Sequence, residues 1–169
     1  PKRQPNDQIA EELTLRITID ANAALGKREM RLLTPGSMSN PIWFQVSQWE
    51  ERRETEPNDE TPDPVIGSTL PVVVNGQIMP GESDRFSFTA RKGTRLVIAV
   101  DARELMPYLA DAVPGWFQAT LTLRDGSGRE VAYGDDYRYQ PDPVLHVKIP
   151  ADGEYVLEIK DALFRGRED

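Results

Sequence analysis

The chain has 169 residues, of which 38% are apolar and 28% charged, and its formal net charge is −8. This length fits one or two globular domains, and the acidic balance argues against binding to a nucleic-acid backbone. The absence of cysteine excludes disulfides, thiolate zinc sites and cysteine catalysis, and the single histidine, His146, disfavours most acid–base triads. No run of 18 apolar residues predicts a membrane span. We therefore expect an acidic, non-catalytic module.

The charge is unevenly distributed along the chain. Residues 1–53 carry 8 basic and 7 acidic side chains, whereas residues 54–169 carry 12 basic and 21 acidic ones. The change coincides with a polar, charged stretch at residues 48–60, which has too few apolar side chains to bury its own surface. We predict a first domain at residues 1–48, a linker at 49–55 and a second domain at 56–169.

Three strands are predicted in the first domain. Apolar and polar side chains alternate over Leu13–Ile19 and over Ile42–Val46, and Arg28–Leu33 lies between turn sequences. Three strands are too few for a complete sandwich, so residues 1–48 are predicted to be the C-terminal part of an immunoglobulin-like β module. The chain opens on Pro1, with no initiator Met and no signal-peptide pattern, which favours a segment of a larger protein.

The second domain contains a longer series of short strands separated by turn sequences. Two of them, Leu70–Val74 and Gly76–Met79, flank the hairpin dipeptide Asn75-Gly76. One segment differs, since Ala102–Ala112 has the composition of a short helix, although it contains Pro107. The spacing predicts an all-β, antiparallel sandwich or jelly roll. The remaining predicted strands are Arg85–Ala90, Arg95–Asp101, Ala119–Arg124, Glu130–Tyr133, Val144–Ile149 and Glu154–Lys160.

An ordered set of motifs in the second domain resembles the bacterial pre-peptidase C-terminal (PPC) domain. The motifs are Glu56-Pro57-Asn58-Asp59, Gly81-Glu82-Ser83-Asp84-Arg85-Phe86, Lys92-Gly93-Thr94, Asp125-Gly126-Ser127-Gly128 and Asp152-Gly153-Glu154-Tyr155. The resemblance implies a β-sandwich of jelly-roll type that is appended to secreted bacterial proteases and other exported proteins. It also implies similarity to the collagen-binding domains of bacterial collagenases, several of which bind calcium at an acidic N-terminal linker.

Two further comparisons with known families qualify this resemblance. The PPC pattern carries one more strand after the position of Asp169, so the sandwich of residues 56–169 would lack its last strand, and the connection over Ala102–Trp116 is longer than usual. Residues 17–46 are similar to the end of a bacterial TIG-type, immunoglobulin-like repeat.

The strongest candidate site is a set of acidic and amide side chains around the start of the second domain. Ca²⁺ prefers six to eight oxygen ligands. In an extended chain, alternate positions such as 54, 56 and 58 point the same way, and Pro57 disfavours helix at the residue before it. The resemblance implies that these positions and Asp84 close on the cation; a solvated acidic linker is the alternative. The candidate metal ligands are Glu54, Glu56, Asn58, Asp59, Glu82 and Asp84.

Two weaker candidate sites lie further along the chain. Trp116, Tyr137 and Tyr139 offer rings that could stack on a polysaccharide or an extracellular, collagen-like protein, although aromatic side chains more often pack in the core. Asp135 and Asp136, with Asp142 nearby, could serve a glycosidase, although such residues more often shape turns. His146 alternates with apolar neighbours in a predicted strand and is expected at the surface.

The sequence thus predicts a non-catalytic accessory or adhesion module of an exported bacterial protein, located in the periplasm, at the cell surface or outside the cell. Its expected partners are other domains of the parent protein, with Ca²⁺ stabilising the interdomain linker. A carbohydrate- or protein-binding module that uses the loop aromatics is the alternative. A glycosidase-like enzyme is the third and least favoured.

Overall fold

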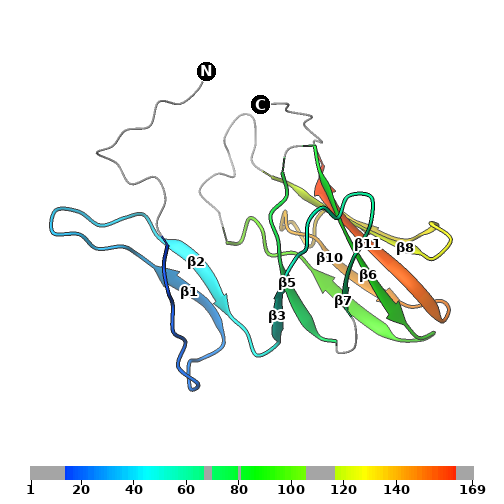
Figure 1. The fold of residues 1–169 in the computed structure, drawn as a ribbon, viewed down its shortest axis with the longest axis horizontal. Coiled ribbons are helices and arrows are strands. Elements are labelled where there is room, and N and C mark those ends of the chain that lie inside the picture. The colour runs from blue at the N-terminus through cyan, green and yellow to red at the C-terminus, as the bar shows by residue number, and fades with distance from the viewer. Residues whose placement is uncertain (1–13, 67–69, 80, 106–116, 163–169) are drawn as a thin grey trace.

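A computed structural model of the chain describes residues 14–66, 70–79, 81–105 and 117–162, and these residues form eleven strands and no helix (Figure 1). The all-β class predicted from the sequence is therefore confirmed. Within the described ranges there is no helix long and apolar enough to cross a membrane. The strands are β1 (Gly26–Met30), β2 (Ile42–Val46), β3 (Glu50–Arg53), β4 (Asp63–Ile66), β5 (Val72–Asn75), β6 (Ser83–Ala90), β7 (Arg95–Ala99), β8 (Ala119–Asp125), β9 (Glu130–Gly134), β10 (Val144–Lys148) and β11 (Gly153–Asp161).

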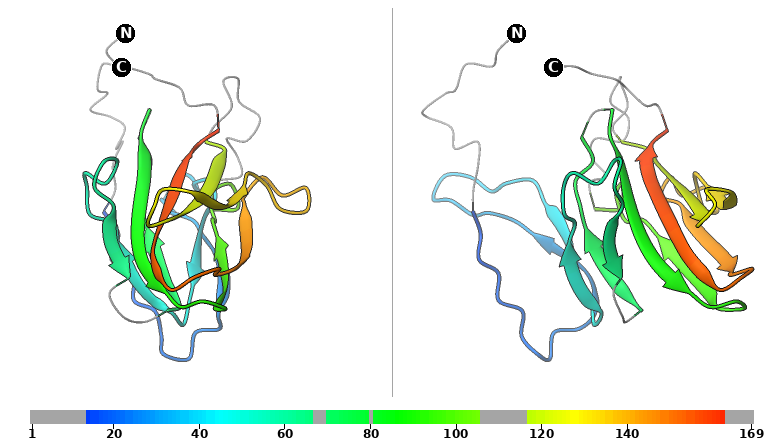
Figure 2. Two further views of the ribbon diagram at one scale, coloured as in Figure 1. Left: turned by 90° about the vertical axis from the view of Figure 1, so that its right-hand side faces the viewer. Right: turned by 45° about the vertical axis from the view of Figure 1, so that its right-hand side comes forward.

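The largest sheet has five strands in the order β4-β6-β11-β8-β9. All neighbours in it are antiparallel except β4 and β6, which are parallel. Strands β6 and β11, far apart in sequence, lie side by side at its centre (Figure 2). A second, antiparallel sheet consists of β7 and β10. The core lies between these two sheets, as expected of a β-sandwich.

Alternation along the central strands explains this core. Leu121 and Leu123 of β8 are fully buried, and Tyr155 of β11 stacks on Phe88 of β6 with ring centroids 6.0 Å apart. The opposite sheet contributes Leu145 of β10. Successive side chains of a strand point to opposite faces of the sheet. In β6, Asp84 therefore points to the same inner face as Phe86 and Phe88, and all three are buried.

Two further sheets have two strands each, namely β1-β2 and β3-β5. Strands β1 and β2 pair as an antiparallel hairpin, which lies to one side of the remaining strands (Figure 1). An ion pair of 3.3 Å between Lys27 Nζ and Glu104 Oε1 joins this hairpin to the loop after β7. Strands β3 and β5 pair in parallel, Glu50 opposite Val72. Strand β3 falls inside the predicted linker at residues 49–55; the division into two domains stays a prediction.

The predicted hairpin at Asn75-Gly76 is wrong. Strand β5 ends at Asn75, but residues 76–79 form no strand, and β5 pairs with β3 instead. The backbone groups that a hairpin would use have other partners, since Asn75 O accepts the N–H of Glu54 at 3.1 Å and the Gln77 N–H donates to Glu54 Oε1. The Glu54 segment thus takes the place of the second hairpin strand.

Of the three strands predicted within residues 1–48, one is placed as expected. Ile42–Val46 is β2, while the strand predicted at Arg28–Leu33 begins and ends earlier, as β1. The strand predicted at Leu13–Ile19 is wrong, since residues 14–19, the part of it that the structure describes, form no strand. Leu15, Ile17 and Ile19 are 44–51% exposed there, because no strand pairs with this segment in the part of the chain that is described. Leu13 lies outside it.

The helix predicted at Ala102–Ala112 is not found where the structure describes that segment. Residues 102–105 form a bend and a turn, and residues 106–112 lie outside the described ranges. Asp142 accounts for the turn, because its carboxylate accepts the backbone N–H groups of Ala102, Arg103 and Glu104 at 2.9–3.0 Å. The other predicted strands of the second domain correspond to β6–β11 with ends that differ by one or two residues.

Candidate metal centre

Five carboxylates meet at the entrance of the sandwich. They come from the segment that follows β3, from the turn before β6 and from β6 itself. One carboxylate oxygen from each of Glu54, Glu56 and Asp84 lies within 4.8 Å of the others, and the same holds for Glu56, Asp59 and Glu82. The two groups share Glu56, so the carboxylates form one continuous cluster, which we call the acidic cluster.

Glu54 is positioned by the chain that follows β5. Its backbone N–H donates to Asn75 O at 3.1 Å, which extends the β3–β5 pairing by one residue. Its Oε1 accepts the Gln77 N–H. A Cβ on Gly76 would collide with the Glu54 carboxylate, so the absence of a side chain at position 76 allows this close approach.

Asn58 joins the acidic segment to the sandwich. It is fully buried, and its Oδ1 accepts the backbone N–H of Arg85 at 3.3 Å. Its Nδ2 lies 3.5 Å from Glu54 Oε2, and its backbone N–H donates to Glu56 Oε2 at 2.9 Å. Both polar atoms of the Asn58 side chain therefore have protein partners, and these contacts orient two of the carboxylates.

Asp84 is the most unusual member of the acidic cluster. It is the second residue of β6, is 4% exposed, and faces inward like Phe86 and Phe88 further along the strand. Its Oδ1 is buried without a hydrogen-bond partner among the described residues. Burial, and then repulsion from the other four carboxylates, raises the pKa of Asp84 to about 7. An ionised Asp84 is thus unfavourable here unless a positive charge compensates it.

Repulsion also acts on the outer members of the cluster. The pKa of Glu56 is raised by desolvation and by Glu82, Glu54 and Asp59, although the Asn58 N–H opposes this shift. Asp59 Oδ1 is buried and lacks a partner in the described ranges. Glu82 Oε2 accepts the Met79 N–H at 2.7 Å, which holds its carboxylate at the turn before β6.

Three residues that sequence reasoning missed support this arrangement. Asp63, at the start of β4, accepts the Thr55 N–H at 2.7 Å, and Gly76 makes room for Glu54. Arg85 donates from Nη1 to the backbone oxygen of Asp59 and from Nε to Glu158 Oε2 at 2.9 Å. Arg85 follows Asp84 directly in the PPC-like motif, and this position beside a predicted ligand could have indicated its role.

The chemistry of the acidic cluster suits a hard cation. All six predicted ligands lie in it or beside it, and their oxygens are the donors that Ca²⁺ prefers. Two buried carboxylate oxygens, on Asp84 and Asp59, lack partners among the described residues, and buried polar atoms are otherwise nearly always paired. The residues present therefore fit a bound cation.

The predicted aromatic surface is only partly described. Trp116 lies outside the described residues. Tyr137 is partly buried, with its ring centroid 5.7 Å from that of His146, which is exposed as expected. Tyr139 is completely exposed at the tip of the loop between β9 and β10. These two tyrosines, although only two positions apart, therefore have different environments.

The second acidic group does not gather at one point. Asp135 and Asp136 are exposed on the loop after β9, and Asp142 is partly buried. The Asp142 carboxylate accepts three backbone N–H groups of the turn after β7. Such contacts give Asp142 a structural role in that turn.

Comparison with known sequences identifies the part of the chain from the turn before β6 to the end of β11. The family described as the bacterial pre-peptidase C-terminal domain matches residues 82–161, so the predicted resemblance is confirmed over this segment. A probable subtilase-type serine protease of Deinococcus radiodurans is 41% identical over 80 residues, which make up 47% of this chain and 10% of the relative. Glu82 and Asp84 lie inside the family match; Glu54, Glu56, Asn58 and Asp59 precede it.

Proposed function

We propose that this chain, whose residues 82–161 match the bacterial pre-peptidase C-terminal family, is a non-catalytic accessory module of an exported bacterial protein, stabilised by Ca²⁺ at the acidic cluster. The similar protease supports an appended role, because the shared segment is only 10% of its length. On this basis the module lies outside the cytoplasm, and its partners are other domains of the parent protein.

The observation that carries the calcium proposal is the state of Asp84. A carboxylate that is 4% exposed, lacks a partner on Oδ1 in the described residues and lies among four other carboxylates is destabilised when ionised. A divalent cation would supply the missing positive charge and the missing contacts. Glu54, Glu56, Asp59, Glu82 and Asp84 would hold it, and Asn58 would orient Glu54 and Glu56.

The location of the cluster explains what a bound ion would do. Its ligands come from the segment after β3 and from the start of β6, that is, from the entrance of the sandwich and from its central sheet. A cation that binds both would stabilise the folded state and restrict the motion of the segment that leads to β1 and β2. The module would then act as a rigid spacer when calcium is present.

Thermal unfolding of the 169-residue chain with Ca²⁺ or with a chelator tests this proposal. Calcium at about a hundred times its dissociation constant would stabilise the fold by about 2.7 kcal/mol, which corresponds to a rise in Tm of roughly 5–10 °C. Asp84→Asn keeps the shape of the side chain and removes the charge. We expect it to fold, to abolish the calcium-dependent rise and to remove the calorimetric heat of calcium binding.

Asp135→Asn is the matched control, because Asp135 is an exposed carboxylate outside the acidic cluster. It should keep the full response to calcium. The proposal is overturned if wild-type protein shows neither a shift in Tm nor heat on calcium addition. It is also overturned if Asp84→Asn and Asp135→Asn respond to calcium alike.

The enzymatic alternative has weaker support. A glycosidase needs two carboxylates that face one another across a substrate. The Asp142 carboxylate accepts three backbone N–H groups of the turn after β7, and Asp135 and Asp136 are exposed on the loop after β9.

A further inference from the structure

The loop between β9 and β10 contains a tight turn with a costly backbone. Tyr137 and Gln140 exchange two backbone N–H···O hydrogen bonds of 2.9 Å, which leaves two residues at the tip. Both have positive φ, 50° at Arg138 and 66° at Tyr139. Two-residue turns of this kind strongly favour Asn-Gly, because a larger side chain strains a left-handed backbone.

The strained turn presents one aromatic side chain to solvent. Tyr139 is 102% exposed, so packing does not explain the conformation of its backbone. Tyr137 differs, because its ring centroid lies 5.7 Å from that of His146 and 5.1 Å from the Arg138 guanidinium carbon. Strained backbone is retained most often where a side chain is needed in one particular place.

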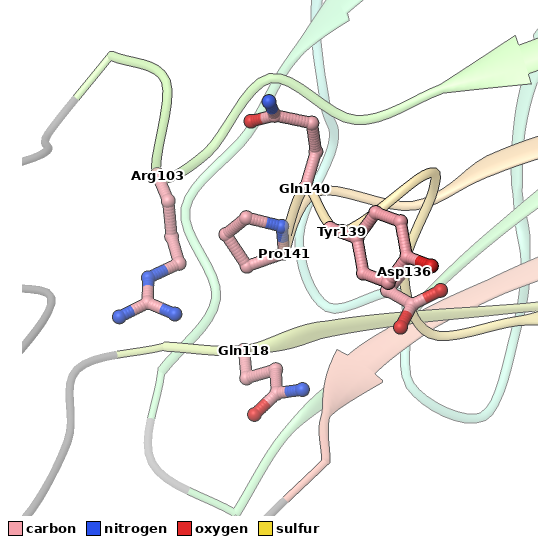
Figure 3. Close-up of a pocket in the computed structure, with 6 residues that line it drawn as sticks. All are labelled: Arg103, Gln118, Asp136, Tyr139, Gln140 and Pro141. Carbon is pink, nitrogen blue, oxygen red and sulfur yellow. The ribbon is translucent and has the colours of Figure 1, made fainter.

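A shallow cavity of about 310 Å³, largely open to solvent, adjoins the exposed ring. Figure 3 shows Pro141 in its middle, with Arg103 at the left, Gln118 below, Gln140 above, and Tyr139 and Asp136 at the right. These residues come from three separate segments, namely the turn after β7, the start of β8 and the loop between β9 and β10. Four of the six lining side chains are charged or amides; the full set is Arg103, Gln118, Asp136, Tyr139, Gln140 and Pro141.

The lining side chains define the chemistry of a ligand. Arg103 only donates hydrogen bonds, Asp136 only accepts them when ionised, and the two glutamine amides do both. Hydroxyl groups on adjacent carbons satisfy such a mixed set, because each can donate and accept. The opposite charges of Arg103 and Asp136 favour a neutral ligand, and the open face of Tyr139 can stack on the apolar C–H face of a sugar ring.

We propose that this cavity and Tyr139 form a subsite for a neutral saccharide. The proposal goes beyond the accessory role above and does not depend on calcium, since no residue of the acidic cluster lines the cavity. The two backbone hydrogen bonds between Tyr137 and Gln140 hold the loop in the turn that presents Tyr139 beside the polar side chains, so binding does not have to order the loop backbone. A module with such a subsite would attach its parent protein to a polysaccharide.

Affinity gel electrophoresis of the 169-residue chain tests the subsite. The probes are soluble neutral polysaccharides in the gel, namely a mannan, a xyloglucan and a β-1,3-glucan, each with calcium and with a chelator. We expect retardation by at least one of them in both conditions. Tyr139→Ala and Gln118→Ala should each weaken binding at least tenfold, because one removes the stacking surface and the other removes an amide partner.

Tyr133→Ala is the matched control, because Tyr133 is an exposed tyrosine on β9 that does not line the cavity. It should bind like the wild type, and circular dichroism verifies that every variant is folded. The proposal is overturned if no polysaccharide retards the wild type. It is equally overturned if Tyr139→Ala and Gln118→Ala bind normally, or if Tyr133→Ala loses binding to the same extent.

Discussion

The side-chain oxygen of Asn58 accepts the backbone N–H of Arg85 at 3.3 Å, across 27 residues of sequence. This contact fixes the segment after β3 against the start of β6. It is the reason that Glu54 and Glu56, on one side, lie close to Asp84, on the other. The acidic cluster therefore depends on a buried amide as much as on its carboxylates.

Replacing this amide should weaken both the fold and the cation site. Asn58→Ala leaves the Arg85 N–H without its buried acceptor, and we expect the free energy of unfolding to fall by about 1–3 kcal/mol in chelator. The calcium-dependent rise in Tm should also decrease. Urea unfolding measures the first effect, with Asn75→Ala as control, because the Asn75 amide contacts Glu51 at the exposed surface. Equal losses in the two variants would contradict the role given to Asn58.

In chelator, the stability of the protein should fall as the pH rises. The pKa of Asp84 is raised from an ordinary 3.8 to about 7 in the folded state, so the folded protein binds more protons between these values than the unfolded chain does. The resulting stability is fully present below about pH 4 and is lost as the pH rises through about 7. Between these two values the free energy of unfolding should fall by up to about 1.4 kcal/mol for each pH unit.

Urea unfolding of wild type and Asp84→Asn at several pH values between about 5 and 8 checks this dependence. The groups that face Asp84 are Glu54, Glu56, Glu82 and Asp59, and all of them act in the same direction. Asp84→Asn should flatten the profile and be the more stable protein at the alkaline end. A wild-type profile that rises over this range would contradict the environment assigned to Asp84.

Gly76→Ala should act on the cation site more than on the fold. The added Cβ meets the flexible end of Glu54, so the carboxylate has to move away from its present position. We expect a loss of about 1 kcal/mol or less in chelator and a clearly larger loss of calcium affinity by calorimetry. Gly36→Ala is the control, because an added Cβ meets nothing within 4 Å there. Unchanged calcium affinity in Gly76→Ala would show that Glu54 is not a ligand.

Arg85 should matter more than an exposed arginine that also forms an ion pair. Glu158 is 6% exposed on β11, and Arg85 Nε lies 2.9 Å from its Oε2. Arg85→Met leaves this carboxylate with only the longer contacts to Lys160 Nζ at 3.7 Å and Arg124 Nη2 at 3.9 Å, so we expect a loss of about 1–2 kcal/mol in urea unfolding.

Arg129→Met provides the comparison. Arg129 pairs with Asp125 at 2.8 Å, but its side chain is 81% exposed. Exposed pairs contribute at most about 1 kcal/mol. If Arg129→Met proved as damaging as Arg85→Met, burial of Glu158 could not be the reason for the importance of Arg85.

Replacing Arg138-Tyr139 by Asn-Gly should stabilise the fold and remove polysaccharide binding. Asn-Gly suits a turn with two positive φ angles, and the substitution should relieve about 1–2 kcal/mol of strain. We expect higher stability in urea together with loss of polysaccharide retardation. A double variant that is no more stable than the wild type would mean that the present turn carries no strain.

The sequence by itself determined the central strands of the sandwich. The prediction of Ala119–Arg124 differs from β8 by one residue, because buried leucines alternate with threonines and an Asp-Gly turn follows. It did not reveal β3 or β4, because β3 consists of charged residues and β4 contains a proline. Both strands form parallel pairs, β3 with β5 and β4 with β6. Alternation over Leu13–Ile19 was misleading, since a strand also needs a partner.

For the candidate cation site too, the sequence indicated the residues and the tertiary structure decided their arrangement. Alternation in an extended segment grouped positions 54, 56 and 58, and the resemblance to the PPC family added Asp84 to the predicted ligands. Their proximity, the burial of Asp84 and the raised pKa of its carboxyl depend on contacts such as Asn58 with Arg85 and Glu54 with Gln77. Only the tertiary structure decides these, because burial and repulsion depend on which distant segments pack together.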